Sequence, residues 1–165
     1  MQNKNNWSPL LLRLIVGTGF MMHGWAKLSR GPAGFEKLLI QIGIPFPHLM
    51  SWITPLIEFF GGLFMLLGLF VFFISIPMII TMLVAMFSIQ FKYGFSSVNT
   101  IGLNSNGPVF GPPGYEINLL YIACLISLML TGAGCYSVDY FIKRKKSGKV
   151  FSQYSYYSKG LKNKS

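Results

Sequence analysis

The stretch that decides the fold is residues 50–91, MSWITPLIEFFGGLFMLLGLFVFFISIPMIITMLVAMFSIQF, in which Glu58 is the only charged residue. A single helix of about 42 residues would be about 63 Å long, whereas the hydrocarbon core of a bilayer is about 30 Å thick. The stretch must therefore fold back on itself, and Gly68 marks the expected turn. We predict two membrane-spanning helices, over residues 49–68 and 71–91.

Two further apolar segments flank this stretch. Residues 8–28 contain Arg13 and are not followed by a small-residue cleavage site, so we predict a retained membrane helix rather than a signal peptide. Residues 116–142 predict a fourth span. Residues 92–115 link the third predicted span to the fourth. They are rich in Gly, Pro, Asn and Ser, which predicts an irregular loop outside the hydrocarbon.

A short amphipathic segment lies between the first and second spans. Phe35, Leu38, Leu39 and Ile42 recur at helical spacing with polar residues between them. The segment is too short to cross a bilayer, and we predict a helix that lies at the membrane interface.

The composition fits a membrane protein. Hydrophobic residues make up 52% of the 165 residues and charged residues only 11%, against about 25% in typical soluble domains. Too few polar residues exist to cover the surface of a soluble enzyme. The predicted fold class is therefore all-α, an integral membrane four-helix bundle formed by residues 1–142 with one interfacial helix between spans 1 and 2.

The net charge of +10 is concentrated at the C-terminal end of the chain. Residues 143–165 contain eight Lys or Arg and no acidic residue. They predict a disordered basic tail that contacts anionic lipid head groups rather than nucleic acid. With Lys4, nine basic residues lie on the side of the termini and four on the opposite side, so the positive-inside rule predicts a bacterial inner-membrane protein with both termini in the cytoplasm.

The cysteines and histidines exclude several kinds of redox site. Cys124 and Cys135 would lie about 16 Å apart on one helix, too far for a disulfide. The chain therefore has no dithiol pair for passing electrons to a quinone. Its two histidines, His23 and His48, do not form a ligand cluster, and we predict neither a metal site nor a haem site.

Ionisable residues inside predicted spans are costly, so each is a candidate functional or network residue. They are Arg13, His23, Lys27, Glu58, Glu116 and Asp139. Glu58 is the deepest, roughly 12–14 Å below the outer surface. We expect Glu116 to cap the start of its helix, and Asp139 to pair with a cation such as Arg13.

Small residues predict how the helices pack. The predicted packing glycines are Gly17, Gly24, Gly61, Gly62, Gly68, Gly132 and Gly134. Glu58 shares a helix face with Gly61 and Gly62. Laying this face on the glycine face of the first helix would turn Glu58 toward His23 and Arg13.

Two interpretations of these charges remain open. The first is a buried ion-pair network that fixes helix register and does no chemistry. The second is a quinone-contacting site near the outer leaflet, in which His23 and Glu58 are the candidate catalytic polar groups. Trp25, Trp52 and Phe59 would then form its walls.

The charged residues and glycines together resemble the DoxX family of small four-helix bacterial membrane proteins. The resemblance rests on a set of motifs in chain order: Arg13 with Gly17, then His23-Gly24-x-x-Lys27-Leu28, Glu58-x-x-Gly61-Gly62 with Gly68, Gly114-Tyr115-Glu116, and Gly132-x-Gly134-x-x-Ser137-x-Asp139. It covers about residues 8–140 and leaves out the basic tail. The resemblance implies an inner-membrane protein linked to quinone-coupled sulfur oxidation and to redox-defence complexes.

The resulting expectation is a membrane subunit of an oxidoreductase or redox-stress complex, linked to quinone or sulfur-compound oxidation. Its partner would be a soluble redox protein or a second membrane subunit, and a homo-oligomer stays open. Quinone is the expected diffusible cofactor, with none bound tightly. The alternatives are a non-catalytic scaffold or assembly factor and, third, a small-solute transporter.

Overall fold

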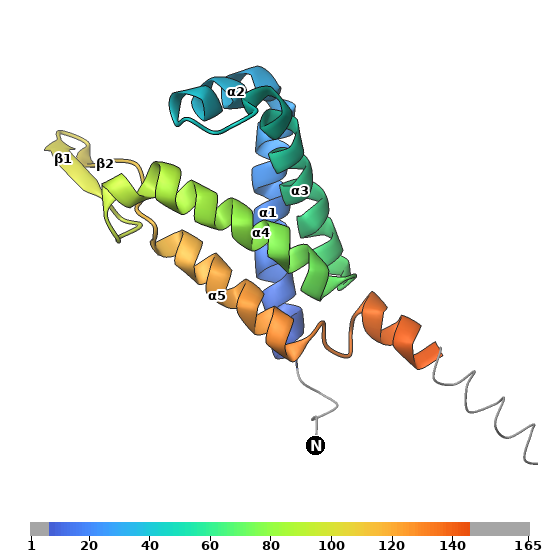
Figure 1. Ribbon diagram of the computed structural model, residues 1–165. Coiled ribbons are helices and arrows are strands. Elements are labelled where there is room, and N and C mark those ends of the chain that lie inside the picture. The colour runs from blue at the N-terminus through green and yellow to red at the C-terminus, as the bar shows by residue number, and fades with distance from the viewer. Residues whose placement is uncertain (1–6, 146–165) are drawn as a thin grey trace, which may run out of the picture.

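The computed structural model describes residues 7–145, and helices occupy most of them (Figure 1). The helices are α1 (Ser8–Ser29), α2 (Pro32–Gln41), α3 (Pro47–Leu67), α4 (Val71–Ala85) and α5 (Glu116–Thr131). Figure 1 shows two antiparallel pairs, α1 with α3 and α4 with α5, and the second pair crosses the first. Helix α2 lies across the end of the α1–α3 pair, as expected for the amphipathic segment.

Glycines bring the backbones of α1 and α3 into contact. A Cβ atom on Gly24 would lie 2.4 Å from the backbone nitrogen of Phe59, and a Cβ atom on Gly17 would lie 2.8 Å from the carbonyl oxygen of Gly62. Gly61 differs from its neighbour, because it faces Met78 of α4. The small residues thus serve two interfaces, one on each side of α3.

The turn between α3 and α4 is where the sequence predicts it. Helix α3 ends at Leu67, and Gly68 and Phe70 adopt left-handed conformations with φ of 66° and 51°. Glycine favours this conformation because it lacks a Cβ atom. At Gly68 a side chain would also collide with the guanidinium of Arg13.

Helical structure continues beyond α4 through a π-helical turn, Met86–Gln90, and a 3₁₀ turn, Phe91–Tyr93. Within the described residues, two helical runs are long and apolar enough to cross a bilayer, Pro47–Leu67 and Val71–Tyr93. Helix α5 is apolar but shorter. Length and composition of these runs therefore indicate a membrane protein.

The fourth predicted span, residues 116–142, is wrong as a single helix. Helix α5 ends at Thr131, and helical conformation resumes only over 138–145. Gly132 and Gly134 both have φ of 78°, which ends the helix. Gly134 also lies against Pro9 of α1, as expected for a packing glycine, whereas nothing lies near the position of a Cβ atom on Gly132. Figure 1 shows the later segment pointing away from α5.

The loop before α5 is also more ordered than predicted. It contains an antiparallel hairpin formed by β1 (Thr100–Asn104) and β2 (Gly107–Phe110). The Asn104 side chain accepts a hydrogen bond of 2.9 Å from the backbone N–H of Asn106, which stabilises the turn. Gly107 supplies the positive φ.

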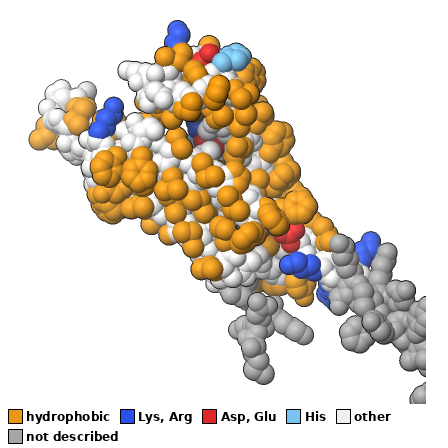
Figure 2. Space-filling model, in the orientation of Figure 1, with side chains coloured by type: hydrophobic (Ala, Val, Ile, Leu, Met, Phe, Trp, Pro, Cys, Tyr) orange, Lys and Arg blue, Asp and Glu red, His pale blue; other side chains and the backbone are white. Residues whose placement is uncertain are grey.

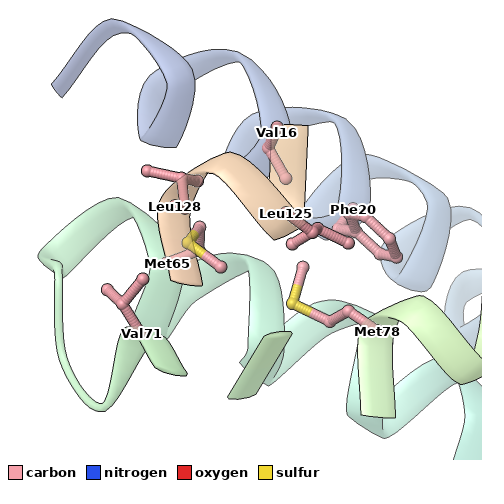
Figure 3. Close-up of a cluster of buried hydrophobic side chains, with 7 residues drawn as sticks. All are labelled: Val16, Phe20, Met65, Val71, Met78, Leu125 and Leu128. Atoms are coloured by element: carbon pink, nitrogen blue, oxygen red, sulfur yellow. The ribbon is translucent and has the colours of Figure 1, made fainter. Parts of the chain in front are cut away.

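The core lies where the two helix pairs cross. It consists of Val16, Phe20, Met65, Val71, Met78, Leu125 and Leu128 (Figure 3). Many large apolar side chains remain on the outer surface, as Figure 2 shows, and this surface suits a lipid environment. The predicted disordered tail, residues 143–165, falls largely outside the described residues.

Candidate functional site

The centre of the site is an ion pair between α1 and α3. The Lys27 ammonium lies 2.5 and 2.6 Å from the two carboxylate oxygens of Glu58. The Glu58 side chain is 3% exposed, whereas the Lys27 side chain is 29% exposed. The acid is therefore the enclosed partner, and the lysine reaches toward the more open side.

This ion pair lies on the wall of a cavity of about 920 Å³. Helices α1, α2, α3 and α4 all contribute side chains to it, and α5 does not. Figure 2 shows a recess between the regions of α2 and α4 in which basic and acidic atoms are visible. Most of its lining is apolar, which is typical of sites that hold small apolar molecules with a few fixed polar contacts.

Helix α2 closes one side of the cavity. Its Phe35 ring lies 4.8 Å from the Lys27 ammonium, so this cation contacts both a carboxylate and an aromatic face. Leu38 and Leu39 of α2 continue the apolar wall. The start of α2 is set by Gly31, whose φ of 79° allows the chain to turn sharply after α1.

The remaining polar groups of the cavity come from three helices. His23 of α1, Thr54 of α3 and Thr81 of α4 all line it. The hydroxyl of Thr81 donates to the carbonyl of Met78, while His23 has an exposed side chain. The cavity thus combines hydrogen-bond donors, a proton-accepting carboxylate and an apolar body.

The structure corrects the expected partner of Glu58. The sequence predicts that this acid faces His23 and Arg13. In the structure it forms its ion pair with Lys27. Arg13 lies at the other end of α1, where it donates hydrogen bonds of 2.8 Å to the carbonyls of Ala133 and Tyr136. Arg13 is 1% exposed and ties α1 to the segment after α5.

The other two acids in the predicted network join separate parts of the fold outside the cavity. The carboxylate of Glu116 accepts hydrogen bonds from the backbone N–H and the hydroxyl of Ser97, at 2.9 and 2.7 Å. Asp139 receives the backbone N–H of Val71 at 3.4 Å, and among the described ion pairs it has none with Arg13. Neither acid lines the cavity.

The expected aromatic walls are also different. None of Trp25, Trp52 and Phe59 lines the cavity, and Phe35 and Phe46 do. The sequence does contain a signal for Lys27 as the partner of Glu58. Lys27 follows Gly24 by three positions and so lies on the face of α1 that contacts α3. Among residues 7–145, no group of three or more His, Cys, Asp or Glu is arranged to hold a metal ion.

Comparisons with known proteins agree with this architecture. The chain is 29% identical over 142 residues to "Putative oxidoreductase CatD" of Bacillus subtilis, covering 86% of this chain and 92% of that protein. It is 27% identical over 145 residues to "Inner membrane protein YqjF" of Escherichia coli, covering 88% and 99%. An uncharacterised protein of Haemophilus influenzae is 26% identical over 144 residues, covering 84% and 96%.

No solved structure matches the chain significantly. The DoxX family model matches residues 8–90, which include α1 to α4 and therefore the whole cavity. The ion pair, the glycine contacts between α1 and α3 and the turn at Gly68 all lie inside this matched region. The chain belongs to the DoxX family of membrane proteins.

Proposed function

We propose that this chain is a quinone-binding subunit of a redox complex in the inner membrane. The observation that carries the proposal is the Lys27–Glu58 ion pair, enclosed on the wall of a largely apolar cavity of about 920 Å³. The name of the Bacillus subtilis relative, an oxidoreductase, supports a redox role.

The chemistry of the cavity suits a quinone ring. Quinone carbonyl oxygens accept hydrogen bonds, and the Lys27 ammonium, the His23 ring and the Thr54 hydroxyl are donors on the cavity lining. The apolar lining matches the rest of such a molecule. Reduction of a bound quinone to quinol takes two electrons and two protons, and the proposed electron source is the cofactor of a soluble redox protein. Lys27 and His23 are positioned to pass the protons.

The proposed arrangement in the membrane has four spans and an interfacial α2. Helices α3 and α4 supply the two long apolar runs, and α1 and α5 pack along them. In Figure 1 the start of α1 and the segment after α5 lie at the same end, and α2 and the hairpin lie at the other. The excess of basic residues near the termini supports placing that end in the cytoplasm.

A second candidate is a membrane scaffold without chemistry. Arg13 supports it, because this buried cation joins α1 to the segment after α5 and does not line the cavity. In that case the Lys27–Glu58 pair would likewise only fix the position of α1 along α3. The two candidates differ in whether the cavity binds a ligand.

The test is saturable quinone binding by the full chain in lipid nanodiscs, followed by protection against thermal unfolding with a decyl-substituted benzoquinone. His23→Ala removes a polar group of the cavity and should weaken binding about tenfold, or ~1.4 kcal/mol. His48→Ala is the matched control, because His48 is exposed and does not line the cavity. Absence of saturable binding by the wild-type chain would reject the quinone site and favour the scaffold.

A further inference from the structure

The cavity is open on one side, and the residues at its rim show where the opening lies. Several lining residues are exposed: His23 and Arg30 of α1, Phe46 before α3, and Ile80 and Val84 of α4. Ile80 is 54% exposed and Val84 41% exposed, although both also contact the cavity. The recess in Figure 2 lies between the regions of α2 and α4. We call the opening bordered by Ile80 and Val84 the portal.

The portal lies at the depth of the lipid tails. Ile80 and Val84 belong to the apolar helical run Val71–Tyr93. At a rise of about 1.5 Å per residue, each is at least about 13 Å from either end of that run. Because the hydrocarbon core is about 30 Å thick, a helix that spans it places both residues in hydrocarbon. A molecule that uses this opening comes from the bilayer and not from water.

The lining of the cavity is polar at the Lys27–Glu58 ion pair and becomes apolar toward the portal. The carboxylate of Glu58 and the ammonium of Lys27 lie on the wall formed by α3 and α1 and neutralise each other. The opposite wall is mostly apolar and includes Ile80 and Val84 of α4 and Ile89 of the following π-helical turn. This order matches an amphiphile with an uncharged polar head at the ion pair and an apolar tail that leaves through the portal.

We propose that the ligand of this cavity is a long-chain, uncharged amphiphile that enters sideways from the bilayer through the portal between α2 and α4. The proposal rests on the proposed function in taking the quinone as the head group. It adds the route of entry, and it assigns Ile80 and Val84 as the residues that admit the tail.

The route can be tested without any quinone. The full chain in nanodiscs is irradiated with a small aryl diazirine that partitions into lipid, or with a charged diazirine that stays in water, and labelled residues are located by mass spectrometry. We expect the lipid reagent to label Ile53, Thr54 and Ile57, the residues of this part of α3 that line the cavity, and the aqueous reagent to leave them unlabelled. Val84→Trp should reduce the lipid labelling about tenfold, since each tenfold in rate corresponds to ~1.4 kcal/mol of barrier.

Controls separate a blocked portal from a misfolded chain. Leu83→Trp is the matched variant, because Leu83 is exposed on α4 but does not line the cavity. It should leave labelling of the three cavity residues of α3 within about twofold, or ~0.4 kcal/mol. Labelling of Phe72 and Phe73, which are exposed on the same helix, should be unchanged in every variant. Ile80→Trp gives a second plug if Val84→Trp does not fold.

Two outcomes would overturn the portal: labelling of Ile53, Thr54 and Ile57 from water alone, or lipid labelling of these three residues that neither tryptophan plug reduces. Adding the decyl-substituted benzoquinone then tests the occupant. If lipid labelling follows the expected pattern but the quinone gives no protection, the quinone function fails and the portal stands. If the quinone protects Ile53, Thr54 and Ile57 and the plugs have no effect on labelling, the portal fails and the quinone site stands.

Discussion

Removing Lys27 should destabilise the protein more than removing Glu58. Lys27→Met leaves the Glu58 carboxylate without its cation in a place where its side chain is only 3% exposed. Breaking a buried ion pair in this way costs about 3–5 kcal/mol. Glu58→Gln instead leaves an ammonium whose side chain is already 29% exposed and which can extend toward the open side of the cavity, so its cost should be about 1–3 kcal/mol.

Thermal unfolding of the purified protein in detergent measures the difference. For a chain of this size, each 1 kcal/mol shifts the melting temperature by about 2–4 °C, so Lys27→Met should lower it by roughly 6–20 °C. Lys37→Met is the control, because Lys37 is an exposed lysine on α2, and it should change the melting temperature by less than about 2 °C.

The double variant Lys27→Met/Glu58→Leu decides whether the two side chains act as a pair. It removes both charges and fills the space with apolar atoms, so it should recover at least about 2 kcal/mol relative to the sum of the losses measured for Lys27→Met and for Glu58→Leu alone. Additive losses, or a Glu58→Gln protein less stable than Lys27→Met, would refute the reasoning from burial.

Three further predictions concern the frame around the site. Gly24→Ala places a Cβ atom 2.4 Å from the α3 backbone and should cost about 1–3 kcal/mol of unfolding free energy, whereas Gly34→Ala has open space and should stabilise α2 by about 0.5–1 kcal/mol, both measured by thermal unfolding. Arg13→Met should cost about 2–4 kcal/mol in the same assay, because it leaves two carbonyls without donors. In a Cys-free variant, a cysteine at Ser105 should react with an impermeant maleimide in intact cells and one at Ser155 should not; the reverse pattern would invert the proposed orientation.

The helical elements followed from hydrophobic length and turn chemistry, but two details did not. An apolar run longer than two bilayer cores must turn, and Gly68 offered the left-handed position for it. Small residues often pack membrane helices, which predicts packing roles for Gly132 and Gly134, and Gly134 does lie against Pro9 of α1. Sequence does not distinguish a packing glycine from one with positive φ, and here φ of 78° ends the helix. The Asn106-Gly107 pair is a typical hairpin turn sequence and is consistent with the turn between β1 and β2.

The site shows a different limit of sequence reasoning. Helical periodicity places Arg13 and Lys27 of α1 on the side that faces Glu58 of α3. It does not tell which of the two cations pairs with Glu58, and the predicted partner Arg13 is wrong. The periodic pattern fixes the face of a helix but not its offset along the axis. That offset depends on contacts such as the close approach of Gly24 to the backbone at Phe59, which appear only in three dimensions. The cavity likewise needs α2 folded over it, and no local pattern predicts that.

The energetics of the ion pair favour a role in the cavity over a role in folding. Backbone contacts at Gly17 and Gly24 already fix how α1 lies on α3. A buried ion pair is often no more stabilising than an apolar pair of the same size, so the fold by itself gives little reason to have one there. The double variant Lys27→Met/Glu58→Leu separates the two roles, because it should be more stable than the sum of the single losses predicts and should lose quinone binding. A variant that is stable and still binds the quinone with native affinity would return the pair to a purely structural role.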